Sequence, residues 1–183
     1  MNRRLLTKKN RDSGFTLIEL MVVIVILGVL AAVTMTVGNL SALGQDNIKR
    51  MLGYSSIAHT GYIMVGLTVY AVSGDPRVQA DGLQGVLFYS AAYAFMNLGA
   101  FACVAALQRR PGVTSQISSF AGLGRRAPLL SIAMTLFLLS LVGIPPTAGF
   151  FGKAVIIISA VEGGGWLTVL AVIMMLNAAA AAF

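Results

Sequence analysis

The chain has 183 residues, of which 57% are apolar and 10% are charged, and its mean hydropathy is +0.85. A soluble domain of this size needs a charged surface, so the composition excludes a soluble enzyme and indicates a protein whose solvent is lipid. The net charge of +7 does not indicate nucleic-acid binding, because the basic residues lie mostly in the first eleven positions and in two loops, without interleaved aromatic residues.

Five apolar runs follow one another, each long enough for a helix that crosses a bilayer. In chain order they cover residues 15–43, 51–72, 83–107, 128–161 and 166–183. Membrane spans must be helices here, because open strands would leave backbone groups unsatisfied in hydrocarbon and no alternating barrel pattern is visible. We therefore predict an all-α, polytopic membrane helix bundle of about five transmembrane spans.

The fourth run is longer than one straight crossing requires, and its middle reads GIPPTAG at 143–149. Two adjacent prolines remove backbone donors and clash with a continuing helix, so we predict a broken helix. The predicted connections are 44–50, 73–82, 108–127 and 162–165, of which only the third has room for a surface helix.

The N-terminus carries the first of two family resemblances. A basic leader and the sequence SGFTLIEL at 13–20 precede an apolar run, and this arrangement resembles the N-terminus of type IV prepilins. The resemblance implies cleavage after Gly14 by prepilin peptidase, methylation of Phe15, and pairing of Glu19 with a neighbour's terminal amine. A carboxylate in an apolar helix is costly without a partner, which agrees with that role. The alternative is an ordinary signal or start-anchor sequence with an incidental glutamate.

The second resemblance covers 32–183 and rests on three stretches. These are GNLSAL at 38–43, NIKRMLGYSSIAHTGY at 47–62 and LSLVGIPPTAGFFGK at 139–153. They resemble NADH-quinone oxidoreductase subunit N, an antiporter-like membrane subunit of respiratory complex I, of which this chain looks like a later portion. We therefore divide the chain into 1–31, a prepilin-like leader and helix start, and 32–183, a fragment of an antiporter-like proton-translocating domain.

Lys153 and His59 are the strongest functional residues of the sequence. Lys153 follows the predicted break within an apolar run, where a charged lysine costs about 2.5 to 3.5 kcal/mol. His59 has an unperturbed pKa near 6.5, which allows proton exchange near neutrality. The resemblance implies a proton-conducting lysine and a relay histidine at these positions. The alternatives are a histidine that is only hydrogen-bonded within the bundle and a lysine that snorkels to an interface.

The other charged residues are predicted to set topology. Lys49 is a possible relay member or a surface anchor, and the arginines at 109–110 and 125–126 are predicted to be cytoplasmic. The two resemblances then disagree, because a prepilin leader stays in the cytoplasm whereas the subunit N resemblance places 44–50 and 108–127 there. One apolar helix cannot have both orientations, so the sequence predicts a fusion of two parts that join near 30–37.

We expect a truncated proton-translocating membrane subunit of complex I in the bacterial inner membrane, surrounded by lipid and other membrane subunits. The sequence has no glycine-rich nucleotide loop and no cysteine cluster. We therefore expect no cofactor, metal or catalytic residue in this chain and no nucleic-acid partner. NADH, flavin, iron–sulfur clusters and quinone would belong to partner subunits, and the chain would be a non-catalytic subunit of a translocase. The alternatives are a type IV pilin-like structural subunit, or a nonfunctional fusion or gene-model artefact.

Overall fold

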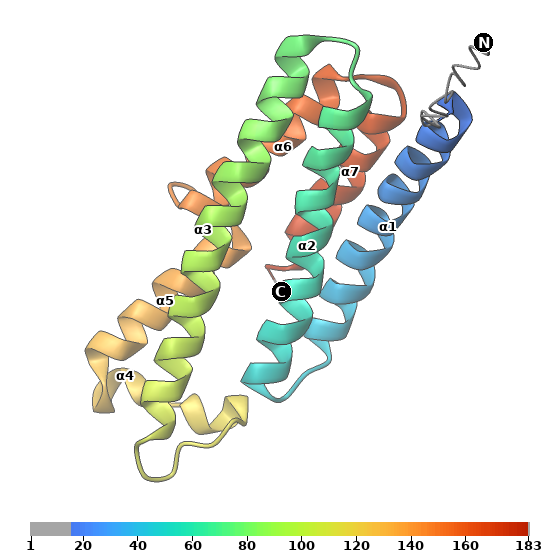
Figure 1. The fold of residues 1–183 in the computed structure, drawn as a ribbon. Coiled ribbons are helices and arrows are strands. Elements are labelled where there is room, and N and C mark those ends of the chain that lie inside the picture. The colour runs from blue at the N-terminus through green and yellow to red at the C-terminus, as the bar shows by residue number, and fades with distance from the viewer. Residues whose placement is uncertain (1–15, 183) are drawn as a thin grey trace, which may run out of the picture.

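The computed structural model describes residues 16–182, and this part of the chain is helical without a β-strand (Figure 1). A single antiparallel bridge in it joins Asn47 to Gln116. The elements are α1 (Leu17–Leu43), α2 (Ile48–Val72), α3 (Pro76–Gln108), the 3₁₀ helix η1 (Ile117–Phe120), α4 (Leu123–Arg126), α5 (Pro128–Val142), α6 (Ala148–Glu162) and α7 (Gly165–Ala180). The predicted all-α fold class is confirmed.

The helices match the five apolar runs, but α2 and α3 begin several residues earlier than predicted. Asn47 caps α2, and its side-chain oxygen accepts hydrogen bonds from the backbone N–H groups of Lys49 and Arg50. Asp75 caps α3 in the same way, with Oδ1 accepting from Arg77 N at 2.8 Å. These caps satisfy N–H groups that a helix start leaves unpaired, so the predicted loops at 44–50 and 73–82 were too long.

The predicted break in the fourth run is confirmed. Helix α5 ends at Val142, and Gly143 adopts a φ of +91°, a left-handed conformation that favours glycine. Helix α6 starts again after Thr147, so Pro145 and Pro146 lie between the two helices. Figure 1 shows α5 beside one half of α3 and α6 beside the other half. Helices α5 and α6 together therefore extend along the length of α3.

By length and apolarity, α1 and α3 are each able to cross a membrane, while α5 and α7 are apolar but shorter. The described helices bury two apolar clusters. One joins α1, α2, α3, α6 and α7 around Met35, Tyr62 and Met174. The other joins α2, α3, α4 and α5 around Leu52, Met96 and Leu107. The break separates α5, whose buried residues belong to the second cluster, from α6, whose buried residues belong to the first.

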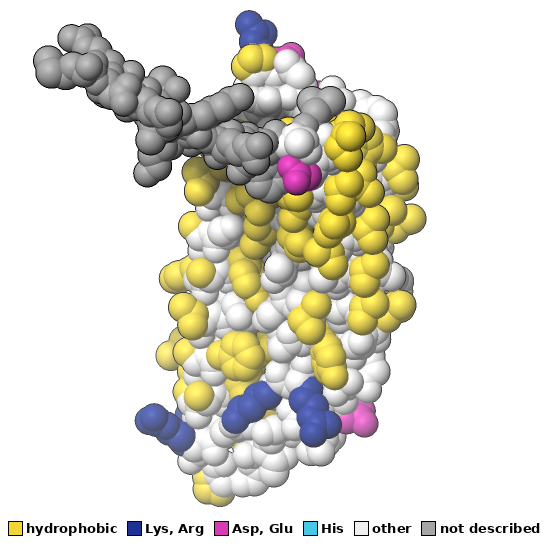
Figure 2. All heavy atoms as spheres, turned by 45° about the vertical axis from the view of Figure 1, so that its right-hand side comes forward, with side chains coloured by type: hydrophobic (Ala, Val, Ile, Leu, Met, Phe, Trp, Pro, Cys, Tyr) yellow, Lys and Arg dark blue, Asp and Glu magenta, His cyan; other side chains and the backbone are white. Residues whose placement is uncertain are grey.

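Charged side chains gather at the two ends of the bundle. The end formed by 44–50 and 108–127, which we call the basic end, contains Lys49, Arg50, Arg109, Arg110, Arg125, Arg126 and Asp46. The opposite end, which we call the acidic end, contains Glu19, Asp75, Arg77, Asp81 and Glu162. In Figure 2 most of the visible lysine and arginine side chains lie at the lower end, below a largely apolar surface. This distribution is typical of a membrane bundle whose basic end faces the cytoplasm.

Candidate functional site

Lys153 lies in α6 and points back to the helix break. Its side chain is only 4% exposed, and Nζ donates to the carbonyl oxygens of Leu141 at 2.9 Å and Val142 at 2.8 Å. The last carbonyls of a helix have no partner within that helix, and they form the negative end of its dipole. The end of α5 therefore supplies two acceptors for the ammonium group, and the structure does not place Lys153 at an interface.

His59 lies in α2, is 3% exposed, and contacts three tyrosine rings. Nδ1 of the imidazole forms a hydrogen bond with the hydroxyl of Tyr89 on α3. The ring of Tyr93 stacks on the imidazole at 4.7 Å with 24° between the planes, and Tyr62 meets it edge-on at 5.5 Å. The imidazole is thus hydrogen-bonded within the bundle, as one of the two sequence interpretations expected, and this is compatible with a relay role.

Tyr62 brings Lys153 and His59 into one cluster. Its ring centroid lies 5.1 Å from Lys153 Nζ, within the range of a cation–π interaction. Its hydroxyl accepts a hydrogen bond from Asn39 Nδ2 at 2.8 Å. The tyrosines were not predicted from the sequence. Their helical spacing was the available signal, since Tyr62 follows His59 by three residues and Tyr89 precedes Tyr93 by four.

A buried amide pair extends this cluster to α1 and α7. Asn39 Nδ2 donates to the backbone oxygen of Asn177 at 2.9 Å, and Asn177 Nδ2 donates to Thr36 Oγ1 at 3.2 Å. Both asparagines are less than 10% exposed. Five helices therefore contribute polar groups to one site: α1, α2, α3, α6 and α7.

Two cavities flank the cluster. One of about 360 Å³ is lined by Gln45 and Ile117 near the basic end and reaches Asn39 and His59. Another of about 460 Å³ is lined by Lys153 and by residues of the break and of α7. Val142 and Ala182 line both cavities. The carbonyl of Val142, which accepts from Lys153, thus belongs to a residue at the boundary between the two.

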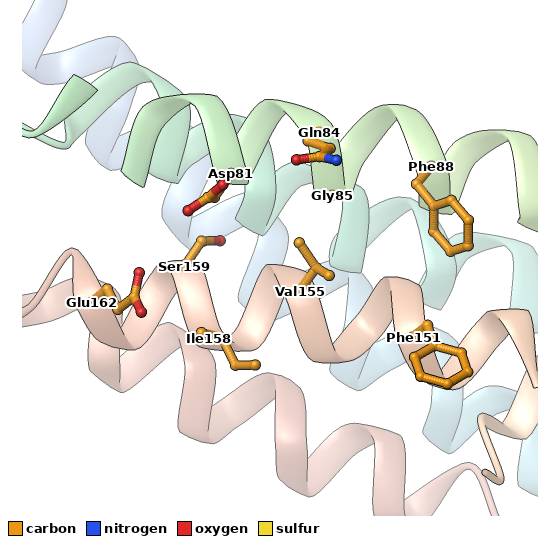
Figure 3. Close-up of a pocket in the computed structure, with 9 residues that line it drawn as sticks. All are labelled: Asp81, Gln84, Gly85, Phe88, Phe151, Val155, Ile158, Ser159 and Glu162. Carbon is orange, nitrogen blue, oxygen red and sulfur yellow. The ribbon is translucent and has the colours of Figure 1, made fainter. Parts of the chain in front are cut away.

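A third cavity, of about 400 Å³, lies between α3 and α6. Figure 3 shows Asp81 and Glu162 at one end of it and the rings of Phe88 and Phe151 at the other. None of the predicted relay residues lines this cavity, so it is separate from the cluster around Lys153.

The other predicted residues are not part of the cluster. Lys49 is exposed in the first turn of α2, as expected for a surface anchor. Glu19 lies in the first turn of α1, where its carboxylate accepts from Thr16 N at 2.8 Å and Thr16 Oγ1 at 2.9 Å. These bonds form a capping box, which gives Glu19 a local structural role. Gly14 and Phe15 lie outside the described residues.

A buried lysine beside a broken helix is an arrangement that recurs in membrane proteins that move ions. The sequence profile of the family described as "NADH:quinone oxidoreductase/Mrp antiporter, TM" matches residues 13–177. The chain belongs to this family, and the match runs through the predicted boundary at residue 31.

Similar proteins include several that are the same subunit of NADH-quinone oxidoreductase, subunit N. NADH-quinone oxidoreductase subunit N 2 of Sorangium cellulosum is 48% identical over 160 residues, which are 87% of this chain and 30% of the relative. Subunit N of Trichlorobacter lovleyi is 49% identical over 159 residues, or 86% of this chain and 30% of the relative. The resemblance to subunit N is confirmed, and the chain spans about 30% of the length of these relatives.

Solved structures show the same fold. A chain of respiratory complex I from Thermus thermophilus with bound aureothin matches with a TM-score of 0.68 and 32% identity, over 86% of this chain and 33% of that one. A chain of the Mrp complex from Dietzia sp. matches with a TM-score of 0.75 and 26% identity, over 86% of this chain and 28% of that one. Both matched chains come from larger complexes.

Proposed function

We propose that this chain is a proton-translocating membrane segment of a subunit N type, which works with other membrane subunits of a complex I in a bacterial inner membrane. The observation that carries the proposal is the setting of Lys153, a buried ammonium held by carbonyls at a helix break beside two cavities. The names of the relatives support the choice of complex I.

The physical argument starts from the cost of a charge in the membrane. An ammonium group in a low dielectric depends on few compensating groups, so a change in a nearby charge shifts the balance between its protonated and neutral forms. Broken helices provide free carbonyls that can hold such a group or the water that replaces it. His59 would exchange protons with the cavity of the basic end, and Lys153 would hold the proton at the break.

The redox chemistry would lie elsewhere in the complex. NADH, flavin, iron–sulfur clusters and quinone would be bound by partner subunits, and this chain would supply a path for protons.

The proposal is tested in a chimaera, in which residues 32–183 replace the matching segment of subunit N from a bacterial relative. NADH-driven proton uptake is then measured in inverted membrane vesicles, together with assembly of the complex. We expect Lys153→Met and His59→Gln to assemble but to reduce uptake to less than about a tenth, because neither side chain can carry the proton. Lys49→Met, a matched change at an exposed lysine, should leave uptake unchanged. Full uptake by the Lys153→Met chimaera would refute the proposal.

Prepilin processing is a separate prediction that no contact in the structure addresses. Mass spectrometry of the N-terminus, after expression with a prepilin peptidase, tests it. A methylated Phe15 at the N-terminus would support a pilin-like leader, and an uncut chain would favour the signal-like alternative.

A further inference from the structure

We propose that Tyr89 is a positioning residue that holds neutral His59 in a single tautomer, with hydrogen on Nε2 and a bare Nδ1. The tautomer follows from the contacts of the two side chains alone. Its meaning for proton transfer rests on the function proposed above.

The first step concerns the hydrogen of the Tyr89 hydroxyl. Tyr89 is 0% exposed, and within residues 16–182 its hydroxyl forms one hydrogen bond, to His59 Nδ1. A buried donor without an acceptor costs about 1 to 3 kcal/mol, so the phenolic hydrogen should point to Nδ1. Nδ1 then accepts, and a neutral imidazole that accepts at one nitrogen carries its hydrogen on the other.

The second step concerns the remaining contacts of the imidazole. Tyr93 stacks on the ring face, and its own hydroxyl is buried and has no hydrogen-bond partner within residues 16–182. Tyr62 meets the ring edge-on, and its hydroxyl is bonded to Asn39. These two tyrosines fix where the ring lies, whereas only Tyr89 distinguishes one nitrogen from the other.

The third step concerns Nε2, the ring nitrogen that Tyr89 does not bind. His59 lines the cavity that extends toward the basic end, and Nδ1 is occupied by Tyr89. Nε2 is therefore the nitrogen left for exchange, and Tyr89 makes it a donor while the ring is neutral. A proton relay built on this ring would offer a hydrogen to the cavity instead of a lone pair.

The chain offers a direct test, because His59 is its only histidine. The full chain with ring-¹⁵N-labelled histidine is placed in lipid bilayers, and solid-state NMR at a pH where the ring is neutral gives the protonation of each nitrogen. We expect hydrogen on Nε2 and none on Nδ1 in the natural chain. Tyr93→Phe, the matched control, should give the same spectrum. Tyr89→Phe should raise the ratio of Nδ1-protonated to Nε2-protonated ring by about tenfold, since one hydrogen bond is lost.

Hydrogen on Nδ1 in the natural chain, or a Tyr89→Phe spectrum identical to it, would overturn the proposal. If circular dichroism shows that Tyr89→Phe is unfolded, the tautomer in the natural chain and in Tyr93→Phe decides alone. The spectra need no proton transport, so a chimaera that fails to pump refutes the proposed function without changing this result.

Discussion

Lys153 is a buried cation whose hydrogen bonds both go to backbone carbonyls. Such a group adds little to the stability of the fold, because the free-energy cost of dehydrating the ammonium offsets much of the gain from its hydrogen bonds to the carbonyls. Replacing a whole buried ion pair by apolar side chains of similar volume is often neutral or stabilising, and Lys153→Met likewise leaves no unpaired charge, since the partners of Lys153 are carbonyls. The cost of keeping Lys153 therefore points to a role in function.

We expect Lys153→Met to leave thermal stability unchanged or to raise it, by about 0 to 3 kcal/mol. The measurement is the midpoint of thermal unfolding of the chain in detergent, followed by circular dichroism. A fall in the midpoint comparable to that of a core cavity variant such as Met174→Ala would show that Lys153 mainly stabilises the fold.

Asn39 and Asn177 join the first and last helices through buried amide hydrogen bonds. Such bonds between membrane helices contribute about 0.6 kcal/mol on average and up to about 1.7 kcal/mol. A double-mutant cycle of Asn39→Ala and Asn177→Ala removes the bond of 3.3 Å from Asn39 Nδ2 to Asn177 Oδ1 but keeps the backbone oxygen of Asn177. The coupling energy should therefore lie in the lower part of this range. A coupling near zero would mean that the pair contributes little to the contact between α1 and α7.

At the scale of elements, α1 and α2 approach closely where glycines replace side chains. A Cβ at Gly61 would lie 2.7 Å from Met35 N and 2.8 Å from Ala31 O, and one at Gly38 would lie 2.6 Å from Ala58 N. Small residues permit this approach between membrane helices, whose association depends on packing. The sequence shows the glycines, but which of them face another helix becomes visible only in the structure.

We expect Gly61→Ala to destabilise the chain by about 1 to 3 kcal/mol, because the backbone of α1 must move away. Gly53 is the matched control on the same helix, since a Cβ there would meet nothing within 4 Å. Gly53→Ala should be neutral or stabilising by up to about 1 kcal/mol. Equal midpoints of thermal unfolding for the two variants would contradict the close contact between α1 and α2.

The break between α5 and α6 could be predicted from the sequence, because proline and glycine act on the local backbone. The placement of Lys153 next to this break followed from its position in the chain. Its carbonyl partners and the tyrosines around His59 could not be predicted, because they depend on which faces of α2, α3 and α6 meet. The early start of α3 was missed because the apolar pattern begins only after the cap at Asp75 and the polar first turns.

At the scale of the whole molecule, the distribution of charge predicts one orientation in the membrane. The basic end contains six of the lysines and arginines among the described residues, whereas the acidic end contains Arg77 and four carboxylates. Helix α1 starts at the acidic end, so the basic leader precedes the end that the positive-inside rule places outside. The prediction therefore stands that the leader and the bundle favour opposite orientations in the membrane.

The most direct test is the orientation of the full chain in bacterial membranes. Single cysteines are introduced at Gly74, on the acidic end, and at Gly124, on the basic end, in a Cys103→Ala background. A Cβ at either glycine would meet nothing within 4 Å, so neither change should disturb packing. Labelling of intact cells with a membrane-impermeant thiol reagent should modify Gly74→Cys and leave Gly124→Cys unmodified until the cells are opened. Labelling of Gly124→Cys in intact cells would mean that the leader sets the orientation, that the cavity at His59 opens to the outside, and that the proposed proton path is wrong for this chain.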